Sequence, residues 1–177
     1  ILEHYLDQVD ELLRGRLVYN YSTCANAGGI LAALLLQDTH RLDRQLYGPG
    51  GFAFQIAHGV QDDGWHMECA TNYHVLIARY YALAVAACDN WGIDLFARRF
   101  PTPVARSVEQ GTAFAGYLGM SFDKWGPTGR NYRSFRDMLD GMIPLMDYRG
   151  MVVANNDSGR HRVDDIYEQA YMHCRDP

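Results

Sequence analysis

The chain has 177 residues, of which 48% are hydrophobic and 21% are charged, so it is long enough to bury one core and has an ordinary globular composition. Its formal net charge is −5 and it contains no run of Lys and Arg, which argues against a nucleic-acid partner because phosphate binding needs a concentrated positive field. Apolar runs such as 31–36 are too short to span a bilayer, so we expect no membrane segment.

Hydrophobic spacing predicts helices along most of the first ninety residues. In the first segment Leu2, Leu6 and Val9 recur at helical intervals with charged residues between them. Polar or glycine-rich breaks after each apolar run mark the predicted helix ends. The predicted helices cover about 2–13, 23–36, 40–46, 52–60 and 70–88. The last of them carries almost no charge besides Arg79, so it should be buried on most sides.

The second half of the chain has a more mixed pattern. A helix is predicted at 104–117 and a Gly- and Pro-containing loop at 123–131. The apolar segment 151–154 reads as a strand that runs into a turn at 155–159, and a last helix is predicted at 163–172. The sequence therefore predicts an all-α fold of antiparallel helical hairpins, with a short strand segment near the C-terminus.

The four cysteines have no metal-binding or redox spacing. No C-x-x-C pair occurs, so neither a zinc ribbon nor a redox dithiol is indicated. We interpret Cys24, Cys69, Cys88 and Cys174 as small apolar core residues, and we expect neither a metal nor a cofactor. Lys124 is the only lysine, so the positive charge is almost entirely arginine, which grips carboxylates and sulfates through two parallel hydrogen bonds.

The best candidate for chemistry is the segment 59–74, which places two histidines, three carboxylates, a Trp and a Tyr directly before the long apolar helix. A polar loop that feeds a buried helix can present reactive side chains with fixed rotamers. The alternative interpretation is an ordinary helix entry with capping residues and one hydrogen-bonded histidine.

Four landmarks follow one another along residues 17–100. The landmarks are Asn20-Tyr21 before an Ala/Leu helix, Tyr47-Gly48-Pro49-Gly50-Gly51-Phe52, the core Asp63-Gly64-Trp65-His66-Met67-Glu68 followed by Tyr73-His74, and Trp91-Gly92-Ile93-Asp94-Leu95. In their order and spacing the chain resembles the helical domain of the heparinase II/III-like polysaccharide lyases, a group that includes alginate-lyase relatives. The chain departs from the family pattern at Ala70, where the family often has Ser, and at Tyr21, where it often has Trp.

The resemblance implies an architecture and an activity. Residues 1–150 would be part of an incomplete (α/α) toroid, and residues 151–177 a junction toward a C-terminal β-sandwich domain of the same parent chain. The implied reaction is β-elimination on a uronic-acid-containing anionic polysaccharide of alginate or glycosaminoglycan type, in the periplasm or outside the cell. In that family the toroid and the sandwich together form the cleft, so the chain by itself is expected to be catalytically weak or inactive.

The chemistry of β-elimination suggests roles for three residues. An amide such as that of Asn20 can donate hydrogen bonds to the negative charge of the substrate carboxylate, and Asn26 is a rival for this role. A tyrosine hydroxyl, with an ordinary pKa of about 10, can protonate the leaving oxygen, which makes Tyr73 the candidate acid. His74, or a residue outside this sequence, could supply a nearby cation or the base itself. Because neighbours on a helix point about 100° apart, one of Tyr73 and His74 should be a supporting residue.

Trp65, Asp63 and Glu68 are the candidate substrate-binding residues. If the long helix already included Glu68, this side chain would lie under Asn72 and away from Tyr73, so either the helix begins after Glu68 or Glu68 contacts something other than Tyr73.

Two other functions remain open from the sequence. The first is an (α/α)-barrel glycoside hydrolase with Asp63 and Glu68 as its two carboxyl groups, which hydrolysis requires about 5 to 9.5 Å apart. The second is a non-catalytic helical glycan-binding or scaffold module, favoured if the Tyr73 hydroxyl is buried and bonded to backbone.

Overall fold

The computed structural model describes residues 1–102, 132–156 and 158–174. The described residues are mostly helical, as predicted. The helices are α1 (Leu2–Arg14), α2 (Asn20–Leu36), α3 (Thr39–Tyr47), α4 (Phe52–Gly59), α5 (Thr71–Asn90), α7 (Phe135–Met142), the short 3-10 helix η3 (Ile143–Leu145) and α8 (Asp164–Cys174). The helix predicted at 104–117 and the loop predicted at 123–131 lie outside the described residues.

Two antiparallel strand pairs accompany the helices. β1 (Phe100–Pro101) pairs with β2 (Tyr132–Arg133), and β3 (Met151–Val152) pairs with β4 (His161–Arg162). The second pair confirms the predicted strand near the C-terminus and adds a return strand. No helix in the described part of the chain is both long and apolar enough to cross a membrane.

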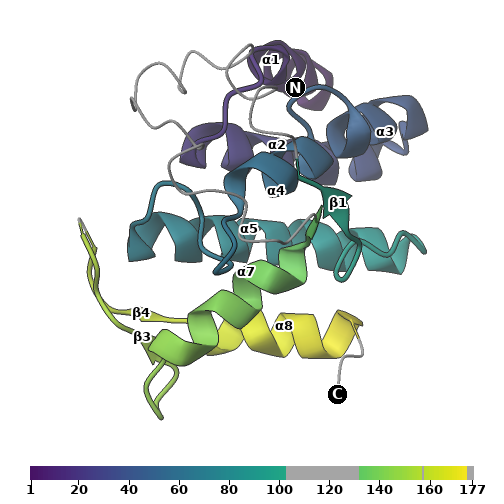
Figure 1. The fold of residues 1–177 in the computed structure, drawn as a ribbon. Coiled ribbons are helices and arrows are strands. Elements are labelled where there is room, and N and C mark those ends of the chain that lie inside the picture. Colours follow the sequence, from purple (N-terminus) through teal and green to yellow (C-terminus); the bar gives the residue numbers. More distant parts are fainter. Residues whose placement is uncertain (103–131, 157, 175–177) are drawn as a thin grey trace.

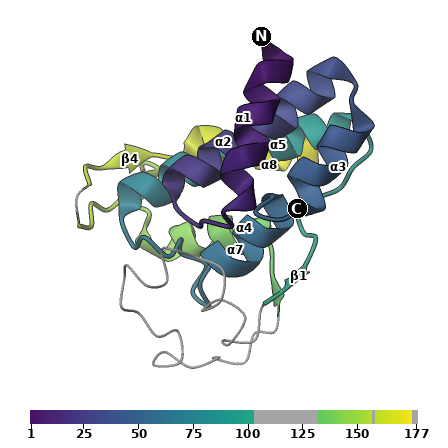
Figure 2. The ribbon, with the colours of Figure 1, turned by 90° about the horizontal axis from the view of Figure 1, so that it is seen from above.

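Helix α5 forms the middle of the molecule. α1, α2, α3 and α4 lie on one side of it, and α7 and α8 lie on the other (Figure 1). α2 packs directly on α5, and α1 lies across α2 on the outside of this layer (Figure 2). α5 buries half of its side chains, but Tyr80 and Leu83 stay exposed, so the expectation that it is buried on most sides holds only for the faces toward its neighbouring helices.

An aromatic cluster joins the two sides of the molecule. Phe52 of α4 contacts Tyr81 of α5 with ring centroids 4.8 Å apart, and Tyr81 contacts Phe135 of α7 at 6.4 Å. Phe96 and Phe100 extend the cluster toward β1. The edge-to-face geometry adds to the burial of these large rings, so the cluster fixes α4, α5 and α7 relative to one another.

A buried polar network crosses the N-terminal helices. Asn26 of α2 donates to the backbone oxygen of Gln45 at 2.9 Å and accepts from the Tyr81 hydroxyl at 3.0 Å. Gln45 in turn donates to Asp10, which pairs with Arg44. Asn26 is fully buried and its amide is committed to these partners, so it cannot reach a ligand and is no longer a rival to Asn20.

Three details differ from the sequence-based expectations. α2 begins at Asn20, three residues before the predicted start, so Asn20 belongs to the first helical turn. Helix α7 was not expected, although Ser134 and Asp137 form a capping box at its start. Cys69 is exposed, with a left-handed backbone φ of 54°, so its interpretation as a core residue was wrong, whereas Cys88 is buried as expected.

Candidate functional site

The segment 59–74 crosses from α4 to α5 through a tight turn. Val60 and His66 form an antiparallel bridge, and Gly64 closes the turn between them with a φ of +87°. A side chain at Gly64 would collide with the backbone oxygen of Asp137 in α7. Only glycine combines this backbone conformation with so close an approach, so the turn is held against α7.

His74 is a buried link between this turn and α7. Its Nε2 lies 3.0 Å from the backbone oxygen of Met138, and its Nδ1 lies 3.0 Å from the backbone nitrogen of His66. The Met138 oxygen can only accept and the His66 N–H can only donate, so the ring is the neutral tautomer protonated at Nε2. Burial lowers the pKa of His74 to about 4, although the hydrogen bond to Met138 and the charge of Asp63 oppose this.

This environment separates His74 from its neighbour in sequence. With both ring nitrogens occupied and no exposure, His74 can neither remove a proton from a ligand nor act as a cation beside Tyr73 at neutral pH. His74 is therefore the supporting member of the pair.

Trp65 is also a structural residue. Trp65 is 9% exposed, its ring lies against that of His74 with centroids 4.4 Å apart and a tilt of 32°, and its Nε1 donates to the backbone oxygen of Gly141 at 3.0 Å. In this position Trp65 cannot offer a stacking surface to a sugar ring. Its contact with His74 instead fixes the entry to α5.

Tyr73 lies in the first turn of α5 and is half-buried. Among the residues that the structure describes, none exchanges a hydrogen bond with its hydroxyl. Other tyrosines differ in this respect, since the hydroxyls of Tyr5 and Tyr167 donate to backbone oxygens and that of Tyr81 donates to Asn26. Within the described part of the chain, the Tyr73 hydroxyl is thus not used by the fold.

The start of α5 is held by the segment after β3. The hydroxyl of Thr71 donates to the backbone oxygen of Val153 at 2.9 Å, and the N–H of Asn72 donates to Ser158 Oγ at 2.8 Å. The backbone oxygen of Cys69 accepts from the side chain of Asn156 at 2.7 Å. These contacts fix the backbone of the first turn of α5, which carries Tyr73. Their sequence separation of more than eighty residues hid them from sequence reasoning.

Glu68 connects the turn to α2. Its Oε2 accepts from the backbone N–H of Asn20 at 2.8 Å, and its Oε1 lies 3.5 Å from Asn20 Nδ2. Burial raises the pKa of Glu68, and the Asn20 backbone hydrogen bond opposes this. The first amides of a helix have no partner within it, and the positive end of its dipole favours a carboxylate, so Glu68 caps α2.

His66 lies beside this carboxylate. Its Nδ1 is 3.6 Å from Glu68 Oε2, and its buried Nε2 has no partner within the described part of the chain. Burial and then the nearby His74 lower the pKa of His66 to about 3, so the ring is neutral at physiological pH. His66 therefore adds no positive charge to the Glu68 environment.

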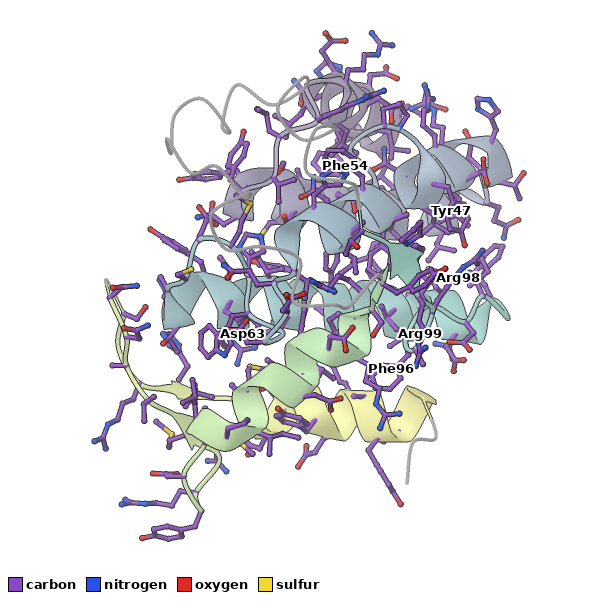
Figure 3. All side chains as sticks on the ribbon, viewed as in Figure 1. Tyr47, Phe54, Asp63, Phe96, Arg98 and Arg99 are labelled. Carbon is purple, nitrogen blue, oxygen red and sulfur yellow. The ribbon has the colours of Figure 1, made fainter. Side chains whose placement is uncertain are left out.

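Asp63, marked in Figure 3, lies apart from Glu68 in its interactions. It is exposed, and its Oδ1 accepts from the Trp65 N–H at 2.9 Å within its own turn. Glu68 instead faces the start of α2. The two carboxyl groups are thus turned toward different elements, which is unfavourable for a hydrolase pair. In the described ranges no group of three or more His, Cys, Asp or Glu is arranged to hold a metal ion.

The landmark 47–52 lies away from this turn and makes its own contact. Arg98 donates to the Tyr47 hydroxyl at 2.6 Å, and its guanidinium lies 4.8 Å from the centre of the Tyr47 ring (Figure 3). This pair joins the end of α3 to the segment before β1. Comparison of the chain with protein-family models, with curated proteins and with solved structures gives no match.

Proposed function

We propose that the chain is the helical part of a polysaccharide lyase that cleaves a uronic-acid-containing anionic polysaccharide, of alginate or glycosaminoglycan type, by β-elimination. The observation that carries the proposal is half-buried Tyr73, whose hydroxyl has no hydrogen-bond partner among the described residues, on a helix start that several other residues hold in place. A hydroxyl bonded to backbone would have favoured a non-catalytic module. The helical arrangement is compatible with part of an incomplete (α/α) toroid.

The contact between Glu68 and Asn20 supports the proposal that Tyr73 and Asn20 act on one glycan. Glu68 contacts Asn20, and Tyr73 follows Glu68 by five positions, which keeps Tyr73 within about 17 Å of Glu68 even in a fully extended chain. Helix α5 begins at Thr71, after Glu68, so Glu68 lies outside the helix that carries Tyr73. Glu68 contacts Asn20 and not Tyr73.

In the proposed reaction, Asn20 donates a hydrogen bond to the uronate carboxylate and stabilises the charge that develops as the neighbouring carbon loses its proton. The electron pair of that C–H bond forms the new carbon–carbon double bond, and the glycosidic C–O bond breaks. Tyr73 gives its proton to the leaving oxygen. The base is a residue outside this set, because His74 is sealed between His66 and Met138.

The proposal is tested by the products of the natural gene product on alginate and on heparan-type substrates. A lyase forms an unsaturated uronate, which absorbs in the ultraviolet, at every cut. New reducing ends without this absorbance would move the assignment to a hydrolase using Asp63 and Glu68. Binding of the glycans without any cleavage would favour a non-catalytic module. The proposal also places the protein in the periplasm or outside the cell, together with a C-terminal β-sandwich domain.

A further inference from the structure

The Glu68 carboxylate contacts both the backbone N–H and the side-chain amide of Asn20. Its side chain reaches 48 positions back along the sequence, where Oε2 accepts from the backbone N–H of Asn20 at 2.8 Å and Oε1 lies 3.5 Å from the amide nitrogen of the same residue. The first contact caps the first turn of α2. The second contact orients the side-chain amide of Asn20. Capping of the helix does not need this second contact.

The chemistry of a carboxylate decides which way that amide is turned. An ionised carboxylate only accepts hydrogen bonds, so it attracts the NH₂ of Asn20 and repels its oxygen. An NH₂ group has two hydrogens that point in different directions. One of them faces Glu68, and the other remains for an external acceptor such as the carboxylate of a sugar.

Among the described residues, no positive charge pairs with Glu68. His66 lies 3.6 Å away but is neutral, since burial lowers its pKa to about 3. Cys24 is protonated, since burial, together with the charge of Glu68, raises the pKa of its thiol to about 11. Asn20 is thus the residue through which Glu68 acts.

We propose that Glu68 is the positioning residue for Asn20, fixing its amide so that one N–H points toward the ligand. This inference rests on the proposed function for its catalytic consequence, but the contact itself does not depend on it. It changes the role of Glu68 from a sugar ligand to a residue that acts through another.

The sharpest variant is Glu68→Gln. Its remaining oxygen can still accept from the Asn20 backbone N–H, so the cap of α2 is kept. Its own NH₂ then faces the Asn20 side chain and favours the opposite amide orientation, with the oxygen toward position 68. We expect a roughly 10- to 100-fold loss in kcat, because a small misplacement of a charge-stabilising donor weakens its hydrogen bond to the transition state.

A double-mutant cycle separates this role from a merely structural one. In the Asn20→Ala background, which retains the backbone N–H and hence the cap, Glu68→Gln should change kcat by less than about twofold. If instead the two effects multiply, Glu68 does not act through Asn20 and the inference is wrong.

Nuclear magnetic resonance gives a second readout that needs no activity. The side-chain amide signals of Asn20, identified by their absence in Asn20→Ala, should shift with pH as Glu68 titrates, and this shift should vanish in Glu68→Gln. The amide of Asn26, which bonds to Gln45 and Tyr81, is the internal control and should not follow Glu68.

The two readouts distinguish failure of the inference from failure of the proposed function. If the Asn20 side-chain amide signals do not shift as Glu68 titrates, the inference is wrong, whether or not the protein is a lyase. If the wild-type protein forms no unsaturated product, the lyase proposal is wrong. The wild-type titration still shows whether Glu68 orients the Asn20 amide. The wild-type titration also decides it if Glu68→Gln fails to fold.

Discussion

At the residue scale, burial decides what the histidines near the turn can do. His66 and His74 are both almost fully buried, and both have pKa values lowered to between about 3 and 4. A histidine in that state keeps its fold contacts only while it stays neutral. Their residue type suggests catalysis, but because they are buried, their protonation would destabilise the fold.

The lowered pKa of His74 predicts acid destabilisation. The folded state binds this proton less readily than the unfolded state, so stability is fully present above pH 6.5 and is lost as the pH falls toward 4. His74 alone should lower the free energy of unfolding by about 2 kcal/mol between pH 7 and pH 5. The raised pKa of Glu68 acts in the opposite direction over the acidic range.

Urea unfolding at the two pH values measures this effect. His74→Gln removes the titrating ring and should reduce the loss, whereas His40→Gln, at an exposed position of α3, should leave it unchanged. Equal losses in wild type and His74→Gln would mean that the acid sensitivity comes from other groups.

The two asparagines of α2 should respond differently to truncation. Asn26→Ala breaks the buried network and removes the Asn26 partner of the Tyr81 hydroxyl and of the Gln45 oxygens, so it should lower the free energy of unfolding by about 2 to 4 kcal/mol. Asn20→Ala retains the backbone N–H that Glu68 caps and should lower it by less than about 1 kcal/mol, while lyase turnover falls about 10²-fold or more.

Thermal unfolding and product formation, measured on both variants, check this pair of expectations. A folded Asn26→Ala protein with wild-type stability would show that the network contributes little. Full turnover by Asn20→Ala would remove Asn20 from the proposed reaction.

At the element scale, the start of α5 depends on a distant hydroxyl. Ser158 accepts from the Asn72 N–H, and Ala70, at the cap position of α5, makes no side-chain cap hydrogen bond. We predict that Ser158→Ala lowers the free energy of unfolding by about 0.5 to 2 kcal/mol, as for the loss of an N-cap. Hydrogen exchange should accelerate at the Asn72 amide.

The control for this prediction is Ser134→Ala, which removes the cap of α7 instead. It should destabilise by a similar amount but leave the Asn72 amide as protected as in wild type. Faster exchange at Asn72 in both variants would indicate general destabilisation and not a specific cap.

Local sequence patterns were sufficient for most of the helices. The apolar spacing and the breaks at 37–39 and 48–51 identified α1, α3 and α4 to within a few residues. The pattern for α7 was also present, since Phe135, Met138 and Met142 are spaced at helical intervals behind the Ser134 cap.

The roles of the site residues could not be read locally. Glu68 caps Asn20 from 48 residues away. His74 and Trp65 are structural because α7 provides Met138 and Gly141 as partners. These contacts arise only when segments far apart in sequence meet, so residue type and spacing left catalytic and supporting roles undecided.

At the scale of the whole molecule, the proposal requires more than these residues. If the cleft is shared with a β-sandwich domain, the 177-residue chain alone lacks part of the contacts that stabilise the transition state. We predict weak or undetectable lyase turnover from the chain alone and at least 10²-fold more from the natural gene product, measured on the same glycans. Equal turnover by both would show that the helical part suffices.

Tyr73→Phe in the natural gene product tests whether Tyr73 protonates the leaving oxygen. The substitution keeps the ring and removes only the hydroxyl, for which the described structure shows no fold contact. The matched control is Tyr80→Phe, two turns along α5, where the ring is 42% exposed. Formation of unsaturated uronate should fall about 10²- to 10⁴-fold in Tyr73→Phe, with unchanged thermal stability, and stay at the wild-type rate in Tyr80→Phe. Wild-type turnover by a folded Tyr73→Phe protein would show that Tyr73 is not the acid.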